Sequence, residues 1–198
     1  FLAGAAATGA VVALGATSAS AAPGMGTAPK LRMQDGEPTI IIGTLGEAQT
    51  INPFLSANES EADWRCKMLY DELVHINPAT YAPEPGIAES WTIDNLTFTF
   101  KIRDNATFSD GSDLTADDVA FTYEQYLNPA NASPRAGKYQ IIKGAQEYIA
   151  GTADTVPGIT VVDPKTISVE LTEPNAAFLY NQRFIFVVPK ALVGDQSG

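Results

Sequence analysis

Polar and apolar residues alternate with a period of two between Thr97 and Ile102, which is typical of a strand that buries one face. We therefore predict a strand over this run, with Phe98, Phe100 and Ile102 facing one core. The pair Asp94-Asn95 comes just before it. Because such pairs close tight turns, residues 91–102 are predicted to form a β-hairpin.

Asp110-Gly111 marks a second turn, and the pattern of a helix start follows it. Thr115 and Asp118 have the spacing of a capping box, in which two side chains satisfy unpaired amides of the first helical turn. The helix is predicted over Ala116–Leu127. It ends before Pro129, because proline disfavours helical geometry in the residue that precedes it.

Other stretches carry shorter patterns. An amphipathic helix is predicted over Glu61–Leu73, with one apolar face formed by Ala62, Cys66, Leu69, Tyr70 and Leu73. The remaining predicted elements are strands over Thr39–Gly43 and Leu73–Ile76, a short helix over Gly144–Ala150, and a hairpin of Ile159–Val162 with Thr166–Leu171. Together these patterns predict an α/β architecture with mixed sheets.

The N-terminal region has the composition of an export signal. Residues 1–29 carry no charge and are rich in alanine, glycine, serine and threonine, which is too weakly apolar for a bilayer-spanning helix. Ala19-Ser20-Ala21 fits the small-x-small cleavage pattern, so we expect a signal peptide over 1–21 and a linker over 22–38. Phe1-Leu2 resembles the residues that come after the arginine pair of a twin-arginine signal, although Sec export stays open.

Charge and chemistry exclude several functional classes. The net charge of −11 argues against nucleic-acid binding, which needs clusters of lysine and arginine. The chain has one histidine, His75, and one cysteine, Cys66, too few for a zinc site built on several such ligands. Cys66 is expected to be a buried, inert thiol rather than a nucleophile paired with His75. We expect no catalytic residues, metal or cofactor.

An ordered set of motifs resembles the family 5 extracellular solute-binding proteins, which are the peptide, nickel and oligosaccharide receptors of ATP-driven importers. Each motif is weak alone, but their order and spacing are specific. The motifs are PGIAESW at 85–91, FTFKIR at 98–103, FSDG at 108–111, LTADDV at 114–119, NPANASP at 128–134 and VDPKTI at 162–167. The likeness covers about Thr39 to Lys190.

The resemblance implies a periplasmic-binding-protein-like two-lobe fold of the large, three-subdomain form, which traps its solute between the lobes. Family members are more than twice as long, so we interpret the chain as an N-terminal fragment holding an incomplete first lobe. On this interpretation residues 39–60 and 175–198 form core segments of that lobe, and 61–174 form an inserted α/β subdomain. The fragment alone is expected to bind solute poorly.

By position, the resemblance implies that ligand contacts come from Glu47–Ser56, Arg135–Tyr139 and Asn181–Phe184. Within these segments five side chains are the ligand-binding candidates: Glu47, Thr50, Asn52, Tyr139 and Arg183. Thr50 and Asn52 are hydrogen-bonding candidates, Tyr139 is an aromatic wall, and Arg183 is taken as the only cation near the return crossing. Ordinary structural roles compete: a turn for Asn52, the core for Tyr139, and solvated surface for Arg183.

The expected function is the extracytoplasmic substrate-binding component of an ATP-binding-cassette transporter. Its solute is expected to be an oligopeptide, its partner a membrane permease, and the protein itself a monomer. A secreted hydrolase and a surface interaction module without a small ligand are the alternatives. A hydrolase would need two carboxylates in a cleft or an activated nucleophile, whereas the acidic residues in the motifs fit turn and cap positions.

Overall fold

The computed structural model describes residues 32–34, 37–39, 50–55 and 62–193, and its contacts divide the chain into two units, Phe1–Gly43 and Thr44–Gly198. Within the first unit, strand β1 (Arg32–Gln34) pairs with β2 (Glu37–Thr39) in an antiparallel hairpin. The expected linker over 22–38 therefore contains a hairpin in its second half. Of the strand expected over Thr39–Gly43, residues 40–43 lie outside the described residues.

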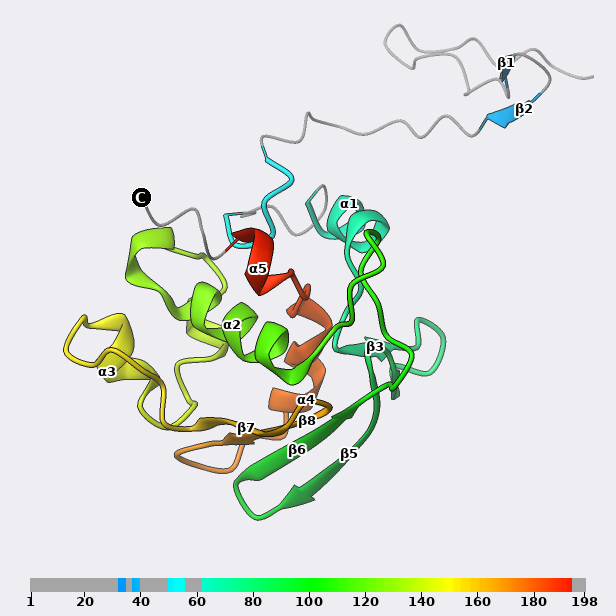
Figure 1. The fold of residues 1–198 in the computed structure, drawn as a ribbon. Helices are drawn as coiled ribbons and strands as arrows, with labels where there is room; N and C mark the ends of the chain where they lie inside the picture. The colour runs from blue at the N-terminus through cyan, green and yellow to red at the C-terminus, as the bar shows by residue number, and fades with distance from the viewer. Residues whose placement is uncertain (1–31, 35–36, 40–49, 56–61, 194–198) are drawn as a thin grey trace, which may run out of the picture. The chain divides into compact units, whose positions relative to one another are not determined.

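A four-stranded sheet in the order β5-β6-β8-β7 forms the base of the second unit (Figure 1). Both predicted hairpins are confirmed, and they join along β6 and β8. All the strand pairs among the described residues are antiparallel, so the expected mixed sheets do not occur in this part of the chain. The strands are β3 (Val74–Ile76), β4 (Pro83–Pro85), β5 (Ala88–Asp94), β6 (Thr97–Ile102), β7 (Ile159–Asp163) and β8 (Thr166–Glu170).

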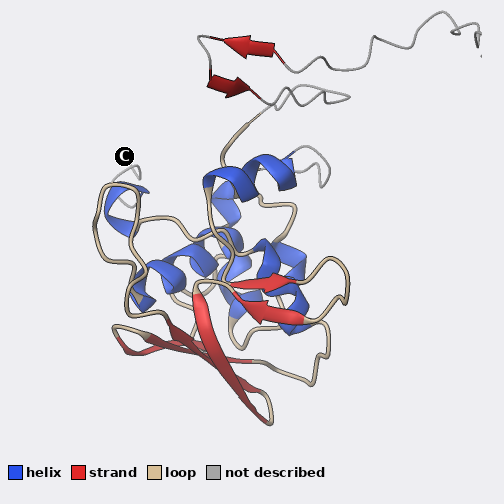
Figure 2. Cartoon of the chain, turned by 90° about the vertical axis from the view of Figure 1, so that its right-hand side faces the viewer, coloured by secondary structure: helices blue, strands red, loops and turns tan. Residues whose placement is uncertain are grey.

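The helices of this unit gather on one face of the sheet, which leaves the other face to solvent (Figure 2). They are α1 (Ala62–Leu69), α2 (Ala116–Leu127), α3 (Ala145–Ile149), α4 (Phe178–Asn181) and α5 (Lys190–Val193), with 3₁₀ turns η1 (Pro129–Asn131), η2 (Ala136–Lys138) and η3 (Gln182–Phe184). Helix α2 crosses the inner face and contacts β7 and β8.

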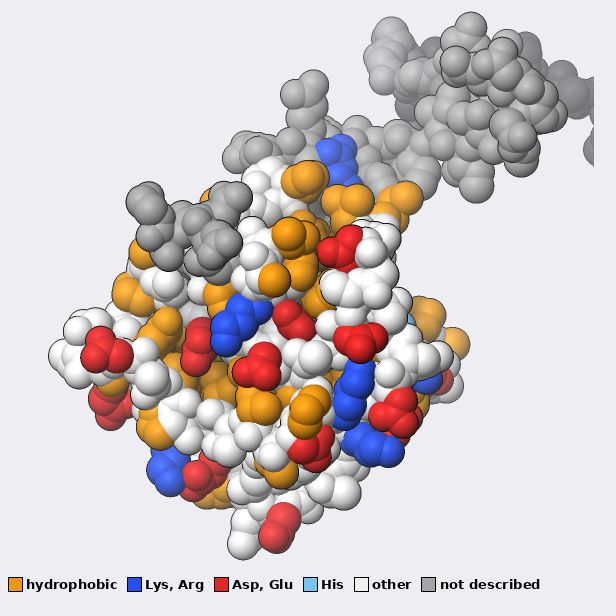
Figure 3. Space-filling model, viewed as in Figure 1, with side chains coloured by type: hydrophobic (Ala, Val, Ile, Leu, Met, Phe, Trp, Pro, Cys, Tyr) orange, Lys and Arg blue, Asp and Glu red, His pale blue; other side chains and the backbone are white. Residues whose placement is uncertain are grey.

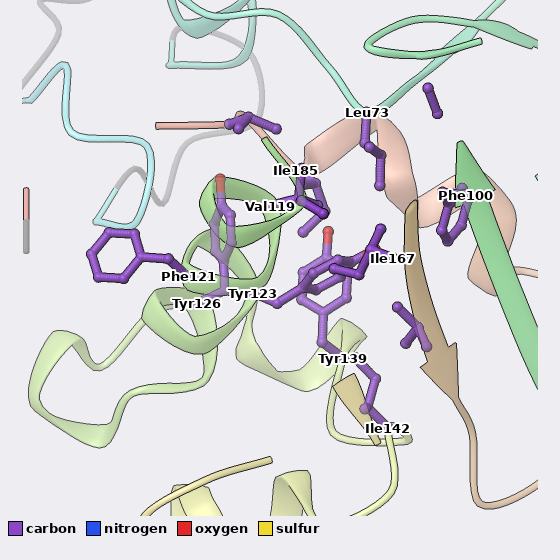
Figure 4. Packing of buried hydrophobic residues seen from close by; sticks show 14 of the residues in the cluster. Leu73, Phe100, Val119, Phe121, Tyr123, Tyr126, Tyr139, Ile142, Ile167 and Ile185 are labelled. Carbon is purple, nitrogen blue, oxygen red and sulfur yellow. The ribbon is translucent and has the colours of Figure 1, made fainter. Parts of the chain in front are cut away.

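The core lies between α2 and the sheet (Figure 4). Phe98 and Phe100 of β6 point into it, as the period-two alternation predicted, and they meet Val119 of α2 there. The predicted capping box starts α2, because the amide and Oγ1 of Thr115 both donate to Asp118 Oδ2 at 2.9 Å.

Helix α1 is shorter than predicted. It ends at Leu69 rather than Leu73, and Leu69 is 58% exposed although the amphipathic pattern placed it on the buried face. Cys66 is buried, as expected. The backbone leaves the helix because it pairs with a distant segment: the amide of Leu73 donates to the carbonyl of Ile185 at 3.1 Å.

That distant segment is the return crossing, defined as residues 178–190. It runs from α4 through η3 and the buried stretch Phe184–Val188 to the start of α5, beside both α2 and β3 (Figure 1). Two side chains of α2 hold its end. Thr122 Oγ1 accepts from the amide of Val188 at 3.2 Å, and Asp118 Oδ1 accepts from the amide of Lys190 at 2.9 Å.

Candidate functional site

Two of the three segments expected to contact ligand lie against each other. The hydroxyl of Tyr139, at the end of η2, donates to the backbone carbonyl of Asn181 in the return crossing at 2.9 Å. These residues are far apart in sequence, so their contact depends on the return crossing packing beside α2. The structure thereby brings 135–139 and 181–184 together.

Local turns position the first of these segments. After α2 ends, Asn128 Oδ1 caps the turn η1 by accepting from the amide of Ala130, and the Asn131 side chain donates back to the carbonyl of Gln125. Ala132 then takes a left-handed conformation at φ 43°, and the hydroxyl of Ser133 accepts from the amide of Arg135. The chain is thus turned back so that η2 lies beside the return crossing.

Three cations converge on the ring of Phe184, the last residue of η3. The guanidinium of Arg135 lies 5.1 Å from the ring centroid, Lys138 Nζ lies 4.7 Å away, and the guanidinium of Arg183 lies 4.5 Å away. We call Arg135, Lys138 and Arg183 with Phe184 the Phe184 cation cluster. Arg183 is consequently not the only cation near the return crossing, which corrects the expectation from the sequence.

The members of the Phe184 cation cluster differ in exposure. Arg135 is only 4% exposed and also lies 5.4 Å from the Phe186 ring, whereas Lys138 and Arg183 are half-buried. The face of an aromatic ring carries negative partial charge, so such contacts stabilise a cation that has lost part of its water. The cluster therefore has one buried cation and two cations that reach solvent.

Three buried tyrosines, Tyr123, Tyr126 and Tyr139, pack together in the core (Figure 4). Tyr139 packs 5.7 Å from Tyr123 and 5.8 Å from Tyr126, centroid to centroid. Burial raises the pKa of all three phenols, and the Arg135 guanidinium opposes that rise at Tyr126 and Tyr139. All three therefore stay protonated near neutral pH. The hydroxyl of Tyr123 bonds to Gln182 Oε1, and that of Tyr139 donates to the carbonyl of Asn181.

The third expected segment reaches the same tyrosines. Phe54 packs edge-on against Tyr126 at 5.0 Å, and the Tyr70 hydroxyl donates to the carbonyl of Ile51 at 3.4 Å. Residues 50–55 therefore lie on the α2 side of the site.

The five sequence candidates take different places. Glu47 lies outside the described residues. Thr50 Oγ1 accepts from the Asn52 amide, and Asn52 Oδ1 accepts from the Phe54 amide at 2.9 Å, so both polar groups close a local turn. Tyr139 is fully buried, which matches the core role weighed for it, and Arg183 stacks on Phe184 instead of standing free in solvent.

Sequence reasoning did not single out Arg135, Lys138 or Phe184, although all three lie within the expected segments. The available signal was the density of basic residues just after Ser133-Pro134, in a chain where Asp and Glu outnumber Lys and Arg by 23 to 12.

A hollow of about 560 Å³ lies elsewhere, between the end of α1, the loop 103–110 and α5. Its one cation, Arg103, donates from Nε to the carbonyl of Gly86 at 2.6 Å and so has a structural role. The hollow shares no lining residue with the Phe184 cation cluster. We therefore place the candidate site at the cluster, where two of the expected segments meet, while the third packs against Tyr126.

Acidic and basic side chains are interspersed on the face of the molecule shown in Figure 3. Among the described residues, no three His, Cys, Asp or Glu side chains are grouped so that they could hold a metal ion. Across the same residues, no helix has the length and apolar composition needed to cross a bilayer.

Comparison with known proteins identifies the class. Residues 82–196, more than half of the chain, match the family model described as bacterial extracellular solute-binding proteins, family 5 middle. The fold and this match define a bacterial extracellular solute-binding protein. The chain belongs to family 5 of that class.

Named relatives are similar over most of this chain. The periplasmic oligopeptide-binding protein OppA of Salmonella typhimurium is 30% identical over 182 residues, which are 89% of this chain and 33% of that protein. The dipeptide-binding protein of Escherichia coli is 30% identical over 151 residues, or 71% of this chain and 27% of that protein. The chain thus spans about a third or less of the length of these relatives.

Solved structures agree on the fold. The Escherichia coli murein tripeptide binding protein MppA superposes with a TM-score of 0.67 at 29% identity, over 75% of this chain and 30% of that one. Haemophilus influenzae OppA in complex with RPPGFSPFR gives a TM-score of 0.68 at 26% identity, over 76% of this chain and 30% of that one. The expected α/β fold class, part of a two-lobe periplasmic binding protein, is confirmed.

Proposed function

We propose that the protein is the extracytoplasmic substrate-binding component of an ATP-binding-cassette importer and that its solute is a peptide. It is exported, works as a monomer and delivers its solute to a membrane permease. It performs no catalytic turnover. Dipeptides, oligopeptides and a murein tripeptide appear in the names of its relatives, which supports a peptide over nickel or an oligosaccharide.

The observation that carries the proposal is the meeting of residues 135–139 with 181–184 at Phe184. The resemblance to family 5 assigns ligand contacts to these two segments, and they lie against each other. They place two half-buried cations, Lys138 and Arg183, beside the buried Phe184 ring, next to the buried tyrosines. A peptide presents carbonyls, carboxylates and apolar side chains, and these groups match such a surface.

The rigidity of the site also suits capture. Tyr139, Phe184 and Phe186 are buried, and the return crossing is held by hydrogen bonds from Thr122 and Asp118. A surface that is ordered before the ligand arrives loses less conformational entropy on binding. A second lobe closing over it would exclude water and strengthen each polar contact.

The test is ligand-dependent stabilisation of the protein expressed from its complete reading frame. Thermal unfolding is followed with pools of dipeptides to nonapeptides, with oligosaccharides and with nickel. We expect the peptides alone to raise the unfolding temperature, because a ligand present at 100 times its Kd adds about 2.7 kcal/mol to the stability of the folded state. Stabilisation by nickel or an oligosaccharide, with none from peptides, would overturn the solute assignment.

A second measurement checks the expected division of the site between lobes. Residues 22–198 alone should bind the same peptide at least about tenfold more weakly than the complete protein, because contacts from the other lobe are missing and water is not excluded. Equal affinity of the two proteins would contradict a site shared between lobes.

A further inference from the structure

We propose that the Phe184 cation cluster binds a carboxylate of the peptide, so that the protein prefers anionic peptides. This inference rests on the proposed peptide-binding function and names the ligand chemistry of the same site. Two sources of carboxylate are possible in a peptide, an aspartate or glutamate side chain and the free C-terminus, and a set of four peptides separates them.

Basic side chains are concentrated around Phe184. The chain has 12 lysines and arginines against 23 aspartates and glutamates, yet three of the 12 lie within 5.1 Å of a single ring centroid. No two of these cations can therefore be much more than about 10 Å apart, which is close to the screening length of physiological salt.

The guanidinium of Arg183 is available for a ligand. The ion pairs among the described residues are Lys67–Glu72, Asp71–His75, Glu89–Lys101 and Lys143–Glu170, and none of them includes Arg183. Its guanidinium is half-buried on the Phe184 ring, which holds it without occupying its N–H donors in an ion pair. A stacked guanidinium keeps its planar fork of donors, and this fork matches the two oxygens of a carboxylate.

The other two cations of the cluster differ in their exposure to solvent. Lys138 Nζ approaches the same ring at 4.7 Å and is half-buried, so it reaches solvent beside Arg183. Arg135 is 4% exposed and contributes its field from behind the ring. A carboxylate beside Arg183, at the exposed side of the cluster, would also lie near Lys138, and partial burial strengthens the attraction.

The experiment uses the protein from its complete reading frame and four tetrapeptides that differ in one group each. Ala-Ala-Glu-Ala and Ala-Ala-Gln-Ala are each prepared with a free C-terminus and as the C-terminal amide. Affinities are measured by calorimetry at low and at about 300 mM salt. We expect the Glu peptide to bind at least about tenfold more tightly than the Gln peptide, with a smaller preference in high salt.

Two variants and one control assign the preference to the cluster. Arg183→Gln should reduce the Glu/Gln ratio to within about twofold, and Arg183→Lys should keep part of it, because the charge stays while the bidentate geometry is lost. Lys143→Gln removes one positive charge from the exposed pair with Glu170, outside the cluster, and should leave the ratio unchanged. Unfolding temperatures of all three variants show that each is folded.

The outcomes separate this inference from the proposed function. The unmodified protein could prefer peptides with a free C-terminus over the amides and show no difference between Glu and Gln. If Arg183→Gln abolishes that preference, the result supports the carboxylate site and assigns the bound carboxylate to the C-terminus. Equal affinity for all four peptides in the unmodified protein overturns the carboxylate site and leaves peptide binding intact. Preference for Glu that persists in Arg183→Gln also overturns it. Failure of every peptide to bind, here and in the stabilisation test, overturns the proposed function itself.

Discussion

Replacing Asp118 with alanine removes a carboxylate that joins the start of α2 to the end of the return crossing. Its Oδ2 accepts from the amide and the hydroxyl of Thr115, and its Oδ1 accepts from the amide of Lys190, all at 2.9 Å. The residue is 8% exposed, so water reaches these donors poorly. One substitution therefore tests both the helix cap and the attachment of the crossing that carries Phe184.

The magnitude can be worked out from the groups that lose a partner. Removal of a capping side chain costs about 1 kcal/mol. Hydrogen bonds to a charged acceptor contribute about 1.5–3 kcal/mol each, and the Lys190 amide takes the lower end because its residue is exposed. Together these losses predict that Asp118→Ala lowers the free energy of unfolding by about 3 kcal/mol.

The assay is equilibrium urea unfolding of the complete protein, together with hydrogen exchange at the amides of Thr115 and Lys190. Both amides should exchange at least about tenfold faster in the variant, since a tenfold change corresponds to about 1.4 kcal/mol of local opening free energy. Asp117→Ala is the matched control. It removes the same charge from the same helical turn, but Asp117 is exposed and contributes only about 0.3–1 kcal/mol through the helix dipole.

The result that would refute this reasoning is equal loss of stability in the Asp118 and Asp117 variants, or unchanged exchange at Lys190. Either would mean that the carboxylate does not hold the crossing. If the reasoning is right, Asp118→Ala should also weaken peptide binding, because its carboxylate holds the return crossing, which carries Phe184, through the amide of Lys190.

Two further predictions concern stability. A Cβ at Gly158 would lie 2.7 Å from the carbonyl oxygen of Lys143 and 2.8 Å from that of Glu170, so Gly158→Ala should lower the free energy of unfolding in urea by about 1–3 kcal/mol. Gly137→Ala is the control, because the space around its Cβ is open, and it should change that free energy by less than about 0.5 kcal/mol. Equal effects of the two substitutions would contradict the packing argument. Burial raises the pKa of Glu124, and the positive charge of Lys190 opposes that rise. The contribution of Glu124 to folding stability is therefore most favourable below the pKa of the unfolded state, and it falls as the pH rises through the pKa of the folded state. Glu124→Gln should therefore raise the unfolding temperature at pH 7, with the gain fading toward pH 4, and a gain that grows on acidification would refute this sign.

The elements that the sequence predicted well are those whose causes are local. The alternation of β6, the capping box of Thr115 and Asp118, and the hairpin of β7 with β8 each depend on residues within a few positions of one another. Their hydrogen bonds form between near neighbours in sequence, so a short pattern contains the whole reason for the structure. The end of α2 before Pro129 belongs to the same group.

Predictions were wrong where a distant partner decides the backbone. The helical pattern of residues 61–73 continues past Leu69, yet the chain turns away so that Glu72 pairs with Phe186 and the Leu73 amide reaches Ile185. More than 100 residues separate these partners. A tertiary pairing of this kind outweighs the small propensity of one helical turn, and no pattern within the turn contains it.

The side chains of the candidate site also depend on partners that are distant in sequence. The resemblance named segments that lie together in the fold, but the cations of the candidate site come from residues 135, 138 and 183, which only the return crossing brings to one ring. Composition pointed the opposite way, because a net charge of −11 describes the whole chain and not the field above Phe184. A ligand responds to that local field, since charges beyond about 10 Å are largely screened in salt. An acidic protein can therefore prefer an acidic peptide, provided that its few cations are gathered where the peptide binds.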